Sequence, residues 1–407
     1  MSAQADSAAS NFSVQPFRSG GRWLVAGGGL GLVLLIASLI GLALDPRQAF
    51  FSYLVAFCYW CGLGFASLLL LMIFHATHAR WVTIIRRPVE AMASTMPLFL
   101  LLVIPVLIGM KHLYSWVDPA NAIPPFTKEA LRLVEHKRAW LNSGFFIGRS
   151  IFYLVIASVF SQLLRGWSLR QDKEGGYALL ERMRRTSAGG LPFIALSMTF
   201  ASFDWMMSLN PTWYSTIFGV YFFAGSFWAA LSLLAIITHL GRLENVFGGG
   251  MNVEHTASVG KLMLAFTAFW TYIAFSQLLL IWIAGLPEEI PFYVTRFNEG
   301  WRWVGVFLII FHFFVPFGAL LSRSLKRNPK QLGIVAAFIL LVHYIDIFWL
   351  VTPTLHIDGF SMHWTNFTAF LGIGLLAIAF GVSRLRGKLP VPVKDPYLSE
   401  SLRYRQP

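Results

Sequence analysis

Ten long apolar stretches constrain this chain more than any other feature of its sequence. Each is close to or above the about 20 residues that cross the hydrocarbon core of a bilayer as an α-helix. Hydrophobic residues make up 56% of the 407 residues and charged residues only 13%, and the mean hydropathy is +0.62, unlike a soluble domain. We therefore predict an all-α integral membrane protein with about ten transmembrane helices. The predicted spans are residues 22–44, 51–75, 92–110, 143–164, 188–208, 216–239, 258–284, 300–323, 331–351 and 364–386.

The placement of the basic residues predicts the orientation of these spans. The formal net charge is +13, and most Lys and Arg lie in the N-terminal segment, the C-terminal segment and the loops after spans 2, 4, 6 and 8. Cytoplasmic loops carry such an excess of positive charge, so both termini are expected in the cytoplasm. The basic segments 165–185 and 384–405 are interpreted as topology signals that also meet anionic lipid. They do not indicate a nucleic-acid partner.

A weak internal repeat predicts how the spans are grouped. Asp204 precedes Pro211 by seven residues in span 5, and Asp346 precedes Pro353 by the same interval in span 9. Spans 2–5 and 6–9 are therefore expected to form two four-helix bundles related as a parallel repeat. The predicted segments are a polar cytoplasmic N-terminus (1–21), span 1 and its loop (22–50), the first bundle (51–211), the second bundle (212–353), span 10 (354–388) and a cytoplasmic tail (389–407).

Two extramembrane segments have a predicted structure of their own. Residues 128–140 are rich in Leu, Glu, Lys and Arg and are expected to form a short surface helix. The tail from Pro390 onward is expected to be extended and to lie on a partner.

Arg149 and Asp204 are the first pair of ionisable residues predicted inside spans. Such residues are costly in lipid and are functional-site hypotheses by default. Both are predicted at a similar depth below the outer surface, in spans 4 and 5. They could form a structural ion pair that locks two helices. Alternatively, they could be the polar end of a quinone-head or proton site, which would need a cavity of roughly 300 Å³ or more reaching Asp204.

His312, His343 and Asp346 are the second set. His343 and Asp346 are three residues apart and so share one face of span 9, and His312 lies near the middle of span 8. The two histidines could ligate a b-type haem, relay protons with Asp346, or hydrogen-bond to neighbouring helices. The bulky neighbours Phe311, Phe313 and Phe314 disfavour a haem.

The sequence carries no evident electron carrier. Cys58 and Cys61 form a C-x-x-C followed by Gly62 rather than His, so covalent haem attachment is not supported, and the two cysteines are interpreted as packing residues. No Walker A motif, iron–sulfur cysteine set, zinc spacing or nucleophile elbow is present. A redox role would therefore need carriers on other chains.

Two longer motifs resemble a known family. They are FDWMMSLNPTWYSTIFGVYFFAG at residues 203–225 and TYIAFSQLLLIWIAGLPEEIP at residues 271–291. Together with YIDIFW at residues 344–349, they resemble the F subunit of bacterial alternative complex III, which is similar to the membrane anchors of polysulfide and nitrite reductases. The likeness covers residues 23–385.

The resemblance implies membership of a quinol:electron-acceptor oxidoreductase complex in the bacterial inner membrane. It implies partners that carry the electrons, namely multihaem cytochrome c subunits and an iron–sulfur subunit, with a paralogous quinol-binding membrane subunit, small membrane subunits and lipids. Menaquinol or another quinol would be the electron donor, and this chain would bind no redox cofactor of its own. Arg149, Asp204, His343 and Asp346 are the positions carried over as quinone-site or proton-relay candidates; the family pattern has His where this chain has Thr212.

Two other functions remain open from the sequence. A secondary transporter would also have repeats and buried charges, but its spans are commonly broken by Gly or Pro near the membrane midplane. Here Pro211 and Pro353 are expected to end spans, and Pro316 in span 8 is the exception. A pure membrane scaffold, whose polar residues only lock helices, is the third possibility.

Overall fold

The computed structural model describes residues 12–122, 125–298, 300–357 and 359–405, and most of the predicted polar N-terminus lies outside these ranges. The described residues form helices and turns without strands, and ten helical segments are long and apolar enough to cross a membrane, as predicted. In chain order the spans are η1 with α2 (Trp23–Leu44), α3 (Pro46–Ala76), η2 with α4 to α6 (Arg80–Ile108), α9 (Ser143–Glu174), α10 with η5 (Ala178–Leu209), α11 (Ile217–Leu243), α12 (Val253–Ala284), α14 with η6 and α15 (Trp301–Leu321), α17 with η7 (Pro329–Thr354) and α18 (Trp364–Leu385). The shorter helices between and after them are α7 (Met110–Leu113), α8 (Lys128–His136), α13 (Pro291–Phe297), α16 (Arg323–Arg327) and α19 (Leu398–Leu402).

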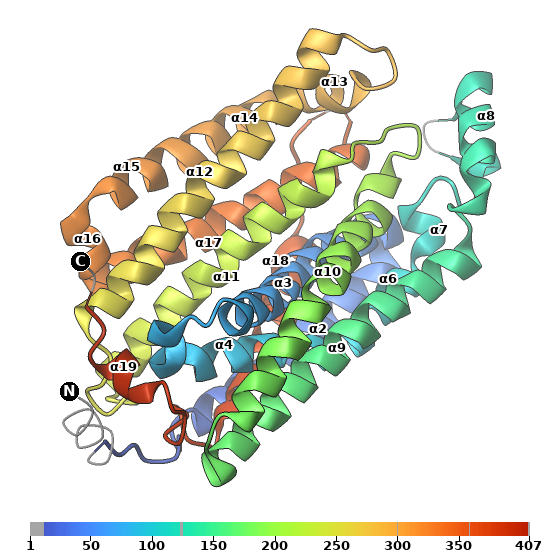
Figure 1. The fold of residues 1–407 in the computed structure, drawn as a ribbon. Helices are drawn as coiled ribbons and strands as arrows, with labels where there is room; N and C mark the ends of the chain where they lie inside the picture. Colours follow the sequence, from blue (N-terminus) through green and yellow to red (C-terminus); the bar gives the residue numbers. More distant parts are fainter. Residues whose placement is uncertain (1–11, 123–124, 299, 358, 406–407) are drawn as a thin grey trace.

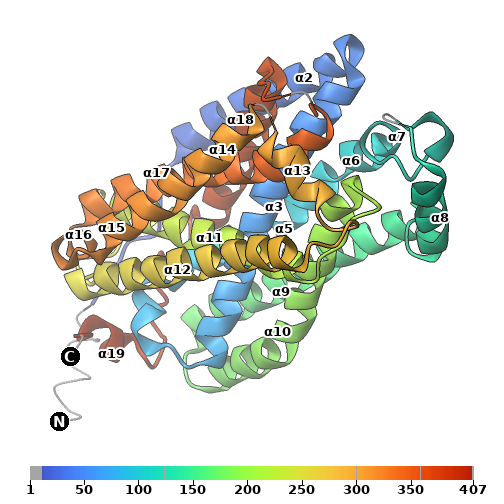
Figure 2. The same cartoon turned by 90° about the horizontal axis from the view of Figure 1, so that it is seen from above.

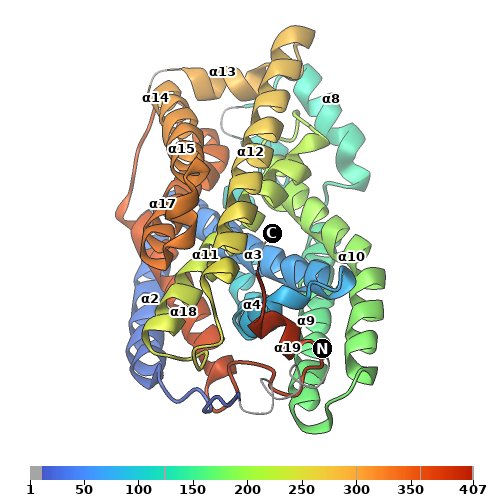
Figure 3. The same cartoon turned by 60° about the vertical axis from the view of Figure 1, so that its left-hand side comes forward.

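Helix α3 is the centre of the molecule. In its apolar segment 94% of the residues are buried, because α3 packs against α10, α11, α17 and α18 at once (Figure 3). It begins at Pro46, earlier than the predicted residue 51, since the Asp45 carboxylate accepts a hydrogen bond from the Gln48 backbone N–H and caps the helix. From above, α2 and α18 lie together along one edge of the molecule, with α9 and α10 on the opposite edge (Figure 2).

The two ends of the helical assembly differ. Helix α19 and the described residues before η1 lie at one end, and α8 and α13 lie at the other (Figure 1). The predicted surface helix at 128–140 is confirmed, since it forms α8 and the short helix Lys137–Ala139. The end that carries α19 is called the terminal end below, and the other end the loop end.

Span 3 is not one continuous helix. It consists of α4 (Arg86–Ala93), α5 (Met96–Leu102) and α6 (Ile104–Ile108), each separated by a short interruption. Side chains of neighbouring spans bind the carbonyls at the breaks: the Tyr53 hydroxyl donates to the Leu102 carbonyl at 2.8 Å, and the Gln162 amide donates to the Ser94 carbonyl at 3.3 Å. Interrupted helices are tolerated at membrane depth when neighbours satisfy the backbone in this way. Span 8, which contains Pro316, is therefore not the only irregular span in the described part of the chain.

Helices α9 and α10 extend beyond the predicted spans at the terminal end. The predicted inner loop at 165–187 is mostly helical, and α9 and α10 are joined by only three residues. The turn depends on Gly175 and Gly176, whose φ angles of 66° and 74° lie in the region that glycine tolerates best.

The C-terminal tail packs on this chain itself and includes the helix α19, which corrects the prediction that it is extended. The tail residues Val391 and Leu398 are buried, and α19 packs on the short helix η2 (Arg80–Ile85). The Asp395 carboxylate accepts a hydrogen bond from the Arg86 guanidinium at 2.6 Å, and Arg86 also bonds the Glu90 carboxylate at 3.2 Å. Buried charges thus tie the tail to the start of span 3.

The same buried charge cluster extends to α9. Arg87 donates to Glu90 at 3.0 Å and to Asp172 at 2.6 Å, and the Ser168 hydroxyl donates to Glu90 at 2.5 Å. Two arginines therefore pair with three carboxylates, of which Glu90 and Asp395 are buried and Asp172 is partly exposed, and such pairing is the condition under which buried charge is tolerated.

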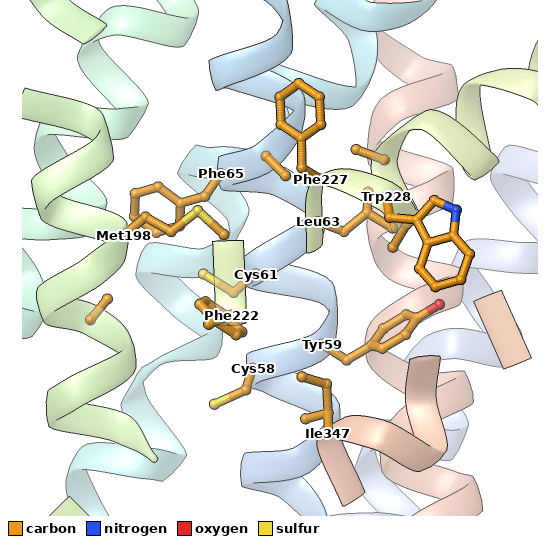
Figure 4. Close-up of a cluster of buried hydrophobic side chains, with 14 of the residues drawn as sticks. Cys58, Tyr59, Cys61, Leu63, Phe65, Met198, Phe222, Phe227, Trp228 and Ile347 are labelled. Atoms are coloured by element: carbon orange, nitrogen blue, oxygen red, sulfur yellow. The ribbon is translucent and has the colours of Figure 1, made fainter. Parts of the chain in front are cut away.

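The core around α3 is made of aromatic, aliphatic and sulfur-containing side chains (Figure 4). The sulfur atoms of Cys58 and Cys61 point to the side of α3 on which Met198 of α10 lies, whereas Tyr59 points to the opposite side (Figure 4), where its hydroxyl donates to the Leu340 carbonyl of α17 at 3.0 Å. Both cysteines are fully buried free thiols, so they pack the core as predicted.

The charge cluster at the tail yields a stability prediction. Asp395→Asn should lower the unfolding free energy by about 3 kcal/mol, because it removes one partner from a buried ion pair. Thermal unfolding of the purified protein in detergent measures the loss. Glu400→Gln is the matched control: its pair with Arg80 is about half exposed, and such pairs contribute at most about 1 kcal/mol. Equal melting temperatures for the two variants would contradict this role of Asp395.

Candidate functional site

Within the described spans, two carboxylates have no exposed surface, Asp204 on α10 and Asp346 on α17, whereas Glu90 of span 3 is 2% exposed. They were predicted as equivalent positions of a repeat. Their partners differ, and that difference decides what each can do.

Asp204 is fully occupied by hydrogen-bond donors. The Arg149 guanidinium donates through Nε to Oδ2 and through Nη2 to Oδ1, each at 2.8 Å. The Tyr153 hydroxyl donates to Oδ2 at 2.9 Å, and the Trp140 indole donates to Oδ1 at 3.2 Å. The predicted Arg149–Asp204 pair is thus confirmed, and its two-pronged geometry is the strong form of such a pair.

The remaining surfaces of Arg149 are also covered. Its Nη1 donates to the Trp140 carbonyl at 3.1 Å, and its guanidinium carbon lies 4.1 Å from the ring centres of both Trp140 and Phe145. Cation–π contacts of this kind stabilise a desolvated charge. Of the two interpretations left open for this pair, the geometry favours the structural lock between α9 and α10.

A cavity of about 370 Å³ lies at the loop end, next to this pair. Trp140 and Ser208 form part of its wall, but Asp204 does not line it. The predicted quinone-sized cavity is therefore adjacent to Asp204 without reaching it. Among the described residues that line the cavity, the basic ones are His136 and Lys137. Burial lowers the pKa of Lys137, whose ammonium donates to the Pro211 carbonyl at 2.7 Å. The other lining residues are Ala139, Leu141, Phe200, Phe203, Met207, Pro211, Trp213 and Tyr214.

Asp346 has far fewer donors. The Tyr221 hydroxyl donates to Oδ1 at 2.5 Å. Oδ2 lies 3.6 Å from His343 Nδ1, which is longer than a hydrogen bond. No arginine or lysine side chain pairs with this carboxylate among the described residues.

The two predicted histidines lie together beside Asp346. The rings of His312 and His343 are nearly parallel, with 5.7 Å between their centres and 18° between their planes. His312 also contacts the indoles of Trp270 and Trp228, with ring-centre distances of 4.2 and 4.8 Å.

Most polar atoms of this group have no hydrogen-bond partner among the described residues. They are both ring nitrogens of His312 and of His343, Asp346 Oδ2, and the indole nitrogens of Trp228 and Trp270. Buried polar groups are nearly always hydrogen-bonded, and clusters of exceptions require an explanation such as bound water or a functional role. Asp346, His343, His312, Tyr221, Trp228 and Trp270 are called the His–Asp cluster below.

Local backbone features bring the cluster together. His312 lies in a π-helical turn, η6 (Ile309–Phe314), in the middle of span 8. The Val315 N–H donates to the Ile310 carbonyl across the wider turn, and Pro316 next to it cannot donate a backbone hydrogen bond. Such turns occur frequently at functional sites. Gly225 on α11 makes room for His343, because a Cβ at that position would lie 2.7 Å from the His343 ring.

The ring geometry bears on the possible haem site. The two rings are nearly parallel with their centres 5.7 Å apart, a geometry that does not by itself define an iron site, and the bulky Phe311, Phe313 and Phe314 next to His312 disfavour a haem. The arrangement instead suits proton exchange, because imidazole and carboxyl groups that lie close together can pass a proton directly or through water.

Sequence reasoning missed several residues of these sites. Tyr153 could have been found, since it lies one helical turn after Arg149 on α9. Trp140, Tyr221, Trp228 and Trp270 belong to other helices or loops, and no spacing rule connects them to the carboxylates. Arg296, assigned to a loop by its position, is buried and donates to the Trp349 and Leu350 carbonyls near the end of α17 at 3.2 and 2.6 Å.

Comparison with known proteins does not identify a family for this chain. No protein-family model matches the chain, and no curated protein matches it significantly.

The contrast between the carboxylates predicts unequal effects on stability. Asp204→Asn should cost about 3 to 5 kcal/mol, because it leaves the Arg149 charge buried without a counter-charge. The double variant Arg149→Met/Asp204→Leu should recover a large part of that loss, since it removes both charges. Asp346→Asn should cost less than Asp204→Asn. Thermal unfolding in detergent measures all three, and a wild-type melting temperature for Asp204→Asn would contradict the structural lock.

Proposed function

We propose that this chain is a membrane subunit of a multisubunit quinol-oxidising electron-transfer complex, and that its own contribution is to conduct protons through the His–Asp cluster. Electrons would pass through haem c and iron–sulfur groups on partner chains, and quinol would be oxidised with a paralogous membrane subunit. The proposal places the chain in the bacterial inner membrane, with both termini in the cytoplasm.

One observation carries the proton-conducting part of this proposal. Asp346 has a single hydrogen-bond donor, whereas Asp204 has four donor atoms around it. A carboxylate locked by a bidentate arginine has little reason to take up a proton. A carboxylate beside two imidazoles whose nitrogens lack partners can exchange one with them. Intramembrane chains of Asp and His are typical of proton relays.

In this proposal the His–Asp cluster carries out proton transfer only. A proton on Asp346 Oδ2 can pass to His343 Nδ1, 3.6 Å away, through one bridging water, and the stacked ring of His312 provides the next site. The Tyr221 hydroxyl remains bonded to Oδ1 and keeps the carboxyl group in place. No electron is transferred within the cluster.

Support for the complex comes from the sequence motifs at 203–225 and 271–291. Both lie at the sites described: the first contains Asp204, Tyr221 and Gly225, and the second begins immediately after Trp270.

A tagged chain purified from its native membrane in mild detergent should bring down chains with haem c absorbance and an iron–sulfur signal. Purification of the chain alone, without haem, would contradict the proposed complex.

Replacing Asp346 tests the proton relay in the intact complex. Asp346→Asn should lower the number of protons released per quinol oxidised, because an amide accepts the Tyr221 hydrogen bond but carries no exchangeable acid proton. Proton release during quinol oxidation by complex in liposomes is the measurement. Glu400→Gln, which changes an exposed carboxylate, should leave the yield at the wild-type level. An unchanged yield in Asp346→Asn would favour the scaffold interpretation.

A secondary transporter is the second candidate, and the irregular spans favour it. The breaks in span 3 and the π-helical turn in span 8 are features of spans that line a substrate path. A transporter predicts proton-coupled solute uptake by the purified chain alone in liposomes, whereas the electron-transfer subunit predicts activity only with its partners.

A further inference from the structure

A second site lies on the side of the molecule away from Asp204. A cavity of about 370 Å³ opens between α3, α4, α11 and α18, and residues before and within η1 (Trp23–Gly27) line it at the terminal end. It extends from Phe17 and Trp23 near the terminal end to Trp60 and Leu63 in the middle of α3. Its length therefore covers one leaflet of the bilayer, the leaflet on the side of the termini.

We propose that this cavity holds the acyl chain of a phospholipid with an amine-bearing head group. The site is independent of the function proposed above, since neither Asp346 nor its partners line it.

The deep part of the cavity suits hydrocarbon. Its walls are mainly aliphatic and aromatic side chains such as Leu63, Leu233 and Ala377. The two polar groups at depth already have partners: the Trp60 indole donates to the Phe370 carbonyl at 2.9 Å, and the Thr95 hydroxyl donates to the Met92 carbonyl at 2.7 Å. A quinone head group would lose its hydrogen bonds to water there without replacement, whereas an acyl chain has none to lose.

The mouth of the cavity suits a zwitterionic head group. Glu244 is the charged residue among the lining side chains, and it is exposed at the terminal end. The exposed Arg386 guanidinium lies beside the same mouth, 3.3 Å from the position that a Cβ on Gly21 would occupy, and Gly20 lines the cavity. An arginine for the phosphate and a glutamate for the amine complement phosphatidylethanolamine. Trp23, 66% exposed, lies at the level where tryptophans anchor to the interface.

Filling the cavity tests the proposal. At Gly381 on α18, an added Cβ would lie 3.7 Å from Thr95 Cγ2 and 3.8 Å from the Ala91 carbonyl oxygen, which are ordinary contact distances, so Gly381→Leu places its larger side chain in the cavity. Gly318→Leu is the matched control, because Gly318 is exposed and no atom lies within 4 Å of an added Cβ.

The first measurement is the phospholipid retained by the full chain after extensive detergent washing, quantified by lipid extraction and native mass spectrometry. Wild type and Gly318→Leu should retain phosphatidylethanolamine, and Gly381→Leu should retain several-fold less. Equal retention in Gly381→Leu, or retention of a quinone in place of phospholipid, would overturn the proposal.

The second measurement uses the wild-type chain and so does not depend on how Gly381→Leu folds. Delipidated wild type should gain thermal stability on addition of phosphatidylethanolamine and gain less with phosphatidylglycerol or a short-tailed menaquinone. An equal or larger gain with phosphatidylglycerol would overturn the assignment of the head group. A gain in thermal stability with menaquinone alone would overturn the assignment of a phospholipid acyl chain to the cavity.

Discussion

Charged side chains inside the helices must be paired with opposite charges, because no water solvates them there. The arrangement of the rest of this structure depends on these buried ion pairs. Arg149 and Asp204 do it as a bidentate pair that joins α9 to α10. At the terminal end, Arg86 and Arg87 share three carboxylates from span 3, α9 and the tail. Breaking such pairs is costly, because the remaining charge is left in an apolar surrounding. These clusters therefore fix the positions of helices that apolar packing alone would leave free to slide.

Against this background the His–Asp cluster is the exception. Its carboxylate has one donor, and its imidazole and indole nitrogens have no partner among the described residues. It also lies where the backbone departs from a regular helix, at the π-helical turn of span 8. The cluster of Arg86 and Arg87 also contains polar atoms without a hydrogen-bond partner, but its carboxylates face arginines, whereas no arginine or lysine among the described residues pairs with Asp346. This contrast is the basis of the proposed proton relay. The breaks in span 3 are different, because neighbouring side chains satisfy their carbonyls.

Much of the architecture followed from hydropathy and spacing, because lipid leaves the backbone few choices. The ten spans, the Arg149–Asp204 pair and the shared face of His343 and Asp346 depend on local periodicity and depth, which a sequence shows directly. The longer α9 and α10, the breaks in span 3 and the packing of Asp395 depend on contacts between distant segments. The same holds for Trp228 and Trp270: their contact with His312 requires three helices to meet, and no single helix encodes it. The two-bundle repeat stays a prediction, since α3 packs as closely on α11, α17 and α18 as on its own predicted bundle.

Infrared difference spectroscopy of the purified protein across a pH jump tests the central distinction between the two carboxylates most directly. Among the carboxyl bands that appear on protonation, one band present in the wild type should be absent in Asp346→Asn. The same band should persist in the Arg149→Met/Asp204→Leu variant. Loss of the band from that double variant, with its retention in Asp346→Asn, would contradict the account, because the exchanging proton would then belong to Asp204.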